Sequence, residues 1–287
     1  MPDRVAAISA AIAGRWAACR LQHGEGTVAC GSRVHSLLVA VVAAVCLLPG
    51  GNAFAQTEAR TDSDPTRPVL FSVRPEYFGV GDGIWRSQII ARYDQAALRK
   101  RRWLSGQRGL LLRFEVPVAF AGASGRASSA GLGDTYAQVL LIPKLSGRFA
   151  LVAGTGVLMP TATSPALGTA KWTLAPAVVP VWFLRGTGMF YVKFQDFISV
   201  AGDEARPEHH FLLITPTLIR RIGGASWILA DTESRTDWER DRTGVKSGLQ
   251  FGHILSNGIG VWIKPEAWWG GDRGGDWNLK TGIVWYR

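Results

Sequence analysis

Alternating apolar and polar positions recur along most of this chain, and they are clearest near its C-terminal end. From Ile259 to Trp269 one set of alternate residues is apolar, whereas the residues between them mix charged side chains with glycine and tryptophan. Segments 244–255 and 277–286 repeat the pattern, and glycine-containing turn sequences separate the three. Side chains of a β-strand point alternately to its two faces, so each segment predicts a strand with one apolar face. A tilted strand of about ten residues is long enough to cross a bilayer.

The same pattern extends upstream and predicts about twelve strands. They are expected at 69–78, 84–93, 109–120, 134–143, 148–159, 171–183, 189–200, 209–220, 225–233, 244–255, 258–269 and 277–286. Most connections alternate between short turns and longer loops, which is typical of a barrel whose two termini lie at the same end. Connections 79–83 and 94–108 break this alternation, so about ten strands is the alternative. The predicted fold class is all-β: a transmembrane antiparallel up-and-down β-barrel.

Some positions predict an irregular wall. Six prolines fall inside or at the ends of the expected strands: Pro143, Pro160, Pro176, Pro180, Pro216 and Pro265. Because proline lacks the N–H that a strand donates to its neighbour, we expect bulges or irregular pairing near them. The alternation also slips near Asp196 and Phe197, where the pattern favours a bulge.

The first residues of the chain follow a different pattern. Arg33 precedes an apolar run from Leu37 to Leu48, Pro49-Gly50 ends that run, and Ala53-Phe54-Ala55 follows. A basic residue, a short apolar run and a small-x-small tripeptide predict a signal peptide that is cleaved after Ala55. The expected organisation is an N-terminal extension plus signal peptide at 1–55, a disordered periplasmic lead at 56–68, and the barrel at 69–287.

Composition agrees with an exported protein. All three cysteines, Cys19, Cys30 and Cys46, precede the expected cleavage site, so the mature chain has none. The sequence carries 32 basic and 22 acidic residues, and removing residues 1–55 leaves 28 and 20, a net charge of +8. No nucleic-acid-binding motif accompanies this charge. The expected partners are therefore outer-membrane lipid and lipopolysaccharide, an anionic small-molecule solute, and the barrel-assembly machinery during biogenesis.

The polar register of the strands predicts which side chains face the barrel interior. Parity places eight basic and three acidic residues there, a basic excess of five: Arg74, Glu76, Arg86, Arg92, Arg113, Glu115, Lys193, Lys246, Lys264, Glu266 and Lys280. Wall charges act strongly across a narrow lumen, so this excess favours a pore lining that passes anionic or aromatic-acid solutes. The alternative is a salt-bridged interior that only fills the barrel.

Hydrolytic chemistry is the weaker alternative. A lipid hydrolase needs a serine, a histidine and an asparagine or aspartate within hydrogen-bond reach on adjacent strands. The mature chain has three histidines, of which His209 and His210 lie in an exposed loop. His253 falls in the lipid-facing register, and Ser247 is too far along the strand to pair with it. We therefore expect no catalytic residue.

Metal and phosphate sites are not favoured either. Asp203 or Glu204 with the histidine pair at 209–210 could hold a metal, and the charge run 231–241 could bind Ca²⁺ or lipopolysaccharide, but solvated loops explain both. The glycines at 131–134 and 154–156 lack the Lys-Ser/Thr pair of a phosphate-binding loop. We expect no metal and no cofactor.

A dense motif lies between residues 131 and 203. Its residues are Gly131, Gly133, Asp134, Pro160, Thr161, Gly168, Lys171, Trp172, Gly202 and Asp203. This motif resembles a family of outer-membrane barrels named for the meta-cleavage pathway of phenol degradation, and segment 274–280 resembles the family's last loop and strand. The resemblance implies a barrel in the cell outer membrane that transports small molecules. A porin-like transporter is the leading expectation, a non-conducting structural or envelope-interaction barrel is second, and a lipid hydrolase is third.

Overall fold

The computed structural model describes residues 63–66, 69–97, 109–124, 128–142, 148–184, 188–255 and 258–286. The expected signal peptide, its cleavage site and Pro143 lie outside these residues. Within the described part of the chain, no helix is long and apolar enough to cross a membrane.

Thirteen strands account for most of the described residues. They are β1 (Phe71–Gly81), β2 (Ile84–Ala97), β3 (Leu110–Ala123), β4 (Ser129–Leu132), β5 (Thr135–Leu141), β6 (Phe149–Met159), β7 (Lys171–Leu184), β8 (Gly188–Gly202), β9 (His210–Ile222), β10 (Ser226–Asp237), β11 (Arg242–Ile254), β12 (Ile259–Gly271) and β13 (Trp277–Trp285).

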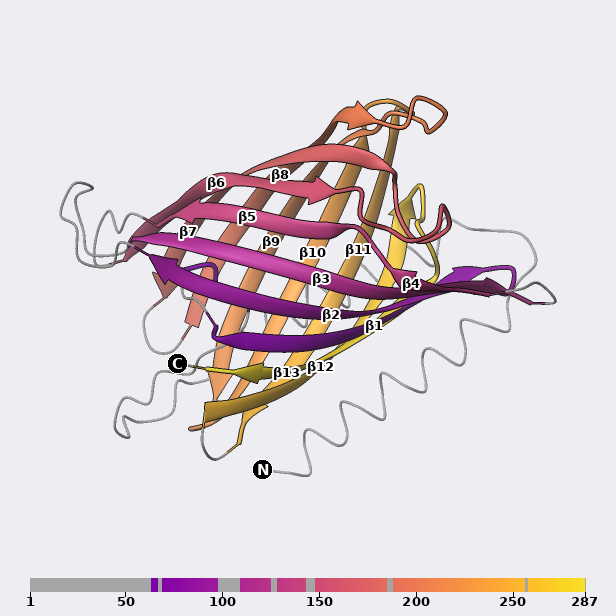
Figure 1. Ribbon diagram of the computed structural model, residues 1–287. Coiled ribbons are helices and arrows are strands. Elements are labelled where there is room, and N and C mark those ends of the chain that lie inside the picture. The colour runs from indigo at the N-terminus through magenta and orange to yellow at the C-terminus, as the bar shows by residue number, and fades with distance from the viewer. Residues whose placement is uncertain are drawn as a thin grey trace. The chain divides into compact units, whose positions relative to one another are not determined.

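These strands close into an antiparallel barrel (Figure 1). Consecutive strands pair from β5 to β13, β1 pairs with both β13 and β2, and β2 pairs with β3 to close the barrel. β4 and β5 pair with successive parts of β3, so together they form one interrupted strand of the wall. Because β4 and β5 count as one strand, the thirteen strands form a twelve-stranded wall. The predicted fold class and strand number are confirmed, and the ten-stranded alternative is wrong.

The expected end of β10 is wrong by four residues. The sequence pattern ended this strand at residue 233 and read the charge run 231–241 as a solvated loop. In the structure β10 continues to Asp237 and pairs with β11 along its whole length, and only residues 238–241 connect the two strands. Polar residues occupy both faces here, so hydropathy could not reveal the strand, although its backbone pairs as fully as the rest.

Bulges occur at other positions than expected. Trp172 pairs with Ala201 and Thr173 with Ser199, so Val200 is the extra residue of β8. Pairing with β9 stays regular through Asp196 and Phe197, and the bulge predicted there is wrong. The β7–β8 ladder does lose its paired residues around Pro176 and Pro180 without a shift of register, as expected for residues that lack an N–H.

The two ends of the barrel differ in their connections. At one end lie the start of β1, the end of β13, and the facing ends of β7 and β8, of β9 and β10, and of β11 and β12. This end is called the inner end here, because short turns and both termini face the periplasm in exported barrels. The longer loops 160–170 and 203–209 lie at the opposite, outer end.

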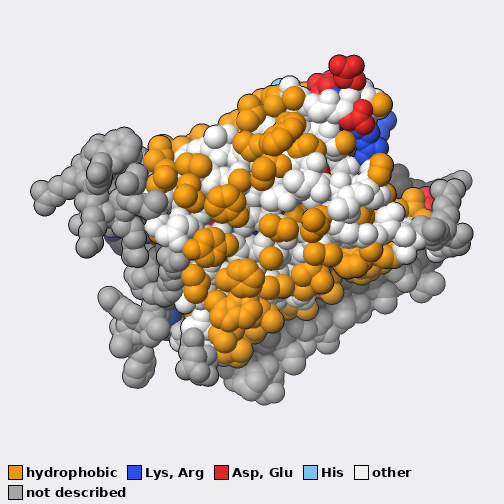
Figure 2. Space-filling model, in the orientation of Figure 1, with side chains coloured by type: hydrophobic (Ala, Val, Ile, Leu, Met, Phe, Trp, Pro, Cys, Tyr) orange, Lys and Arg blue, Asp and Glu red, His pale blue; other side chains and the backbone are white. Residues whose placement is uncertain are grey.

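Outward side chains form an apolar surface. Figure 2 shows one outer face covered mostly by apolar and uncharged side chains, with charged ones gathered at one end. Exposed aromatic and aliphatic residues occur on nearly every strand, from Phe71 on β1 to Ile283 on β13. Aromatic pairs lie at both ends: Phe71 with Trp285 at the inner end, and Tyr77 with Trp277 nearer the outer end. Trp277 and Trp285 are about 26 Å apart along β13, at about 3.3 Å per residue.

The interior of the inner half is apolar and filled. Inward side chains pack there into one buried cluster: Leu111, Leu140, Ile142, Ala150, Val152, Val179, Val181, Tyr191, Ile219 and Leu229. The Tyr191 hydroxyl donates to the Ser63 carbonyl at 2.9 Å, and Asp64 and Thr66 are buried. The described part of the expected disordered lead therefore packs against the inner wall.

Candidate functional site

Ion pairs across the interior face gather around one carboxylate. Glu266 of β12 lies 2.8 Å from the Lys264 ammonium, 3.1 Å from that of Lys280 and 3.5 Å from that of Lys246. Its side chain is only 2% exposed. The register aligns these groups, since Lys264 pairs directly with Lys280 across β12 and β13. The alternation of the sequence had placed Lys246, Lys264, Lys280 and Glu266 on one face, and in the structure these four side chains are in contact.

Two further ionic groups lie on the neighbouring strands. Asp94 is fully buried and contacts the guanidinium groups of Arg92 at 2.5 Å and Arg113 at 3.0 Å. Arg74 contacts Glu76 at 2.6 Å and Glu115 at 3.5 Å. Carboxylates and guanidinium groups at these distances neutralise each other locally, so most predicted lining charges are compensated rather than free.

Sequence reasoning missed three acids of this face. Asp231 lies 2.5 Å from Lys264, Glu233 lies 3.1 Å from Lys246, and Asp94 bridges two arginines. Adding them to the predicted set gives six acidic and eight basic residues, so the basic excess of this set falls from five to two. Asp94 lies one residue past the expected strand 84–93, whereas Asp231 and Glu233 lie at the end of the expected strand 225–233, inside the charge run that was read as a loop.

Two of the eight basic residues predicted to line the interior differ from the others. Among the residues that the structure describes, Arg86 and Lys193 make no ion pair with a carboxylate. Arg86 is exposed on β2 near the outer end, whereas Lys193 lies half-buried in the middle of β8. These are the side chains whose charge remains available inside the barrel.

The family-like motif has a structural role at the outer end. The Asp134 carboxylate accepts hydrogen bonds from the backbone N–H of Ala162 at 3.3 Å and of Thr169 at 2.6 Å. It also accepts the Thr169 hydroxyl at 2.9 Å, and the Thr161 hydroxyl donates to the Gly133 carbonyl at 2.9 Å. One carboxylate therefore fixes both ends of the loop 160–170, which begins at Pro160.

Glycines of the motif make room for this loop. A Cβ at Gly168 would collide with Asp134, and a Cβ at Gly131 would collide with Thr163. Gly202 has φ +131°, which favours glycine, and a Cβ there would collide with the Ala170 carbonyl. The remaining motif residues flank this site: Asp203 donates its N–H to Ala170, and Trp172 is exposed on the outer wall.

Lys171 links this loop to the next. Its ammonium donates to Glu208 at 2.5 Å, and Ser199 donates to the other oxygen of that carboxylate. These two hydrogen bonds hold the pKa of Glu208 below its usual value of 4.5. His209 follows in sequence and bonds to Thr173 at 2.8 Å. Partial burial and the nearby Arg235 lower the pKa of His209 below 6.5.

Metal binding by adjacent histidines is excluded by their directions. His209 bonds to Thr173 on the interior side, whereas His210 starts β9 and bonds to Asp196 at 3.0 Å on the other face. Neighbouring residues of an extended chain point to opposite sides, so these rings cannot share an ion. No cluster of three potential metal ligands exists among the described residues.

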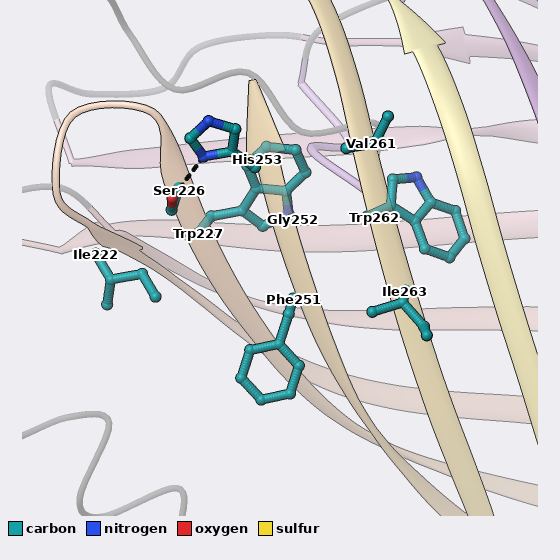
Figure 3. Close-up of a pocket in the computed structure, with 9 residues that line it drawn as sticks. All are labelled: Ile222, Ser226, Trp227, Phe251, Gly252, His253, Val261, Trp262 and Ile263. Atoms are coloured by element: carbon teal, nitrogen blue, oxygen red, sulfur yellow. Dashed lines mark hydrogen bonds between the residues drawn. The ribbon is translucent and has the colours of Figure 1, made fainter. Parts of the chain in front are cut away.

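A serine–histidine pair that sequence reasoning missed lies on the outer wall. Ser226 of β10 and His253 of β11 face each other across the ladder, with Oγ 2.8 Å from Nδ1 (Figure 3). They border a shallow groove lined mainly by apolar side chains, among them Phe251 and Ile263. The other ring nitrogen of His253 has no partner in the described part of the chain, so the asparagine or aspartate of a catalytic triad is missing.

Comparisons with known proteins agree on the fold. No protein-family model and no curated protein sequence matches this chain. Solved structures do: an outer-membrane channel from Pseudomonas putida F1 has a TM-score of 0.61 at 11% identity, covering 82% of this chain and all of that one. The NanC porin has a TM-score of 0.55 at 10% identity, covering 76% and 100%. The KdgM porin has a TM-score of 0.51 at 9% identity, covering 76% and 98%. The chain thus shares the barrel fold of outer-membrane, porin-like channels.

Proposed function

We propose that this protein is a porin-like channel of the outer membrane that passes small anionic solutes. The observation that carries the proposal is a closed barrel with an apolar exterior and a charged interior. A water-soluble protein buries its apolar side chains, but here large ones such as Phe114 and Ile263 are more than 40% exposed on the wall. Aromatic pairs at both ends match the girdles that such barrels place at the two membrane interfaces.

Location and processing follow from the same proposal. Residues 1–55 act as an extension and signal peptide, with cleavage after Ala55, and the barrel is inserted by the assembly machinery among outer-membrane lipid and lipopolysaccharide. The N-terminal residue of the protein isolated from outer membranes tests this directly. Gln56 at that position supports cleavage after Ala55, and a retained segment before it contradicts the proposal.

Selectivity for anions rests on the interior charges. In the set of lining residues named above, eight are basic and six acidic, and Arg86 and Lys193 have no carboxylate partner among the described residues. A small excess of cations acts strongly inside a low-dielectric wall. The lysines around Glu266 are already neutralised, so reversing Lys264 and Lys280 would break ion pairs as well as change the charge.

The motif between residues 131 and 203 supports a finer assignment. We assign the chain to the transporters named for the phenol meta-cleavage pathway, because the motif residues meet in one structure that anchors the loop 160–170. Among the structural neighbours, the KdgM porin has been solved in complex with disordered oligogalacturonate, an acidic saccharide. Passage of an acidic solute is consistent with the basic excess of the lumen.

A non-conducting structural barrel is the second candidate. The compensated ion pairs and the apolar cluster of the inner half favour it, because filled interiors are common in small barrels. Current through planar bilayers separates the two functions. Discrete, reproducible conductance steps from the purified wild-type protein support the channel, whereas stable insertion without current supports the structural barrel.

A further inference from the structure

Lys193 lies on the interior face of the barrel. It pairs with Thr215 in a continuous register between β8 and β9, two residues from the inward Tyr191. Unlike the lysines around Glu266, it makes neither a hydrogen bond nor an ion pair with any residue that the structure describes. A partly buried ammonium without a counter-ion is uncommon in proteins, because the charge is then poorly compensated.

The charges around Lys193 are mostly of its own sign. The groups that act on it are Glu233, Lys280, Arg113 and Lys246. Glu233, the only acid among them, is held by Lys246 at 3.1 Å. Lys193 thus shares its nearest acid with another lysine and forms no ion pair of its own, and a mobile anion is the species that such a charge attracts.

Two hydroxyl groups near Lys193, those of Thr215 and Tyr136, have a proton without an acceptor among the described residues. The Thr215 hydroxyl, directly across the ladder, is buried and has no hydrogen-bond partner. Two residues along β8, Gln195 donates to the Tyr136 hydroxyl at 2.8 Å, which leaves the phenolic proton to donate elsewhere. The Tyr136 ring reaches this position over Gly156, where a Cβ would collide with it. Buried hydroxyls are normally satisfied, so these protons indicate an acceptor that enters from the lumen.

We propose that Lys193, Thr215 and Tyr136 form a subsite for the carboxylate of a small organic anion on its way through the barrel. The inference deepens the proposed channel function and rests on it. A carboxylate has two acceptor oxygens and one charge, which match one ammonium and two hydroxyl donors. A phosphate dianion would need a second uncompensated cation, and the other basic groups that act on Lys193 are already paired with acids.

Blocking of a potassium chloride current tests the subsite. Benzoate is the probe, and benzyl alcohol, which has the same ring without the charge, is its control. We expect benzoate to reduce the wild-type current where benzyl alcohol does not. Lys193→Gln should raise the half-blocking concentration about tenfold, as expected for the loss of one charge-assisted hydrogen bond, and Lys193→Arg should retain most of the block.

Lys264→Gln is the matched control, because it removes the same charge from a lysine that Asp231 and Glu266 already compensate. It should leave the half-blocking concentration within about twofold of wild type, since no direct contact with the anion is lost. Equal shifts in the two variants, or no shift in Lys193→Gln, overturn the subsite while leaving the channel intact. A wild-type barrel that inserts and carries no current overturns both proposals.

Discussion

Replacing Glu266 with glutamine perturbs the most connected ionic group of the interior. The carboxylate contacts three lysines and also accepts the Asn278 amide at 3.1 Å. Two of the lysines keep a second acid, Glu233 for Lys246 and Asp231 for Lys264. Lys280 keeps no carboxylate within ion-pair distance among the described residues, although Glu76 lies opposite it across β1 and β13, so the substitution leaves one ammonium without a direct contact to an acid.

The expected loss of unfolding free energy follows from the number of lysines that lose a contact to a carboxylate. Removing one partner of a buried ion pair typically costs about 3–5 kcal/mol. Only Lys280 loses its one direct contact to a carboxylate, Glu76 remains opposite it, and its side chain is 18% exposed, so we expect the lower end, about 3 kcal/mol. The basic excess of the interior rises from two to three at the same time. Glu266→Gln should therefore also shift the reversal potential further toward the chloride potential.

Urea unfolding of the refolded protein in detergent micelles measures this cost, with tryptophan fluorescence as the signal. Adding Lys280→Met to Glu266→Gln removes the uncompensated ammonium and should recover at least half of the lost free energy of unfolding. Glu239→Gln makes the same chemical change in the exposed connection between β10 and β11 and should be neutral. If Glu266→Gln unfolds at the same urea concentration as Glu239→Gln, the ionic network contributes nothing and the reasoning is refuted.

Three further predictions concern the outer end and the outer wall. Asp134→Ala removes the acceptor of Ala162 and Thr169, so backbone hydrogen exchange at these two residues should accelerate by about tenfold or more; unchanged exchange would show that the loop is held elsewhere. The pKa of Glu208 is lowered in the folded protein, so its stabilising contribution is present above pH 4.5 and is lost as the pH falls through the folded pKa. Wild type and Glu208→Gln should thus differ in melting temperature at pH 7 and converge at lower pH, and a constant difference would contradict this. Ser226 lacks a complete triad, so the wild-type barrel should release no fatty acid from phospholipid vesicles; release that Ser226→Ala abolishes would show a hydrolase.

Alternation was sufficient to predict the fold because each barrel strand has one face toward lipid and one toward the interior. That constraint repeats every two residues, so β3 or β12 can be recognised from its own sequence. The pattern fails where both faces are polar, as at the outer end of β10, where it missed the last four residues of the strand, 234–237.

The candidate site was predictable only in part, since parity gives the face of a residue but not its partner. The contact of Lys264 with Asp231 joins strands that are not adjacent, and it depends on side-chain reach across the space above Gly248. The loop anchored by Asp134 likewise depends on hydrogen bonds between residues up to 35 positions apart, which no local pattern encodes. Only the structure shows that the lysines around Glu266 are paired with acids and that Lys193 is not.

The most direct test of a conducting, anion-selective lumen is the reversal potential of the wild-type protein in a planar bilayer under a potassium chloride gradient. The excess of basic over acidic interior residues and the uncompensated Lys193 predict a current that reverses toward the chloride equilibrium potential. A reversal toward the potassium potential, or no current from correctly folded barrels, would contradict the account.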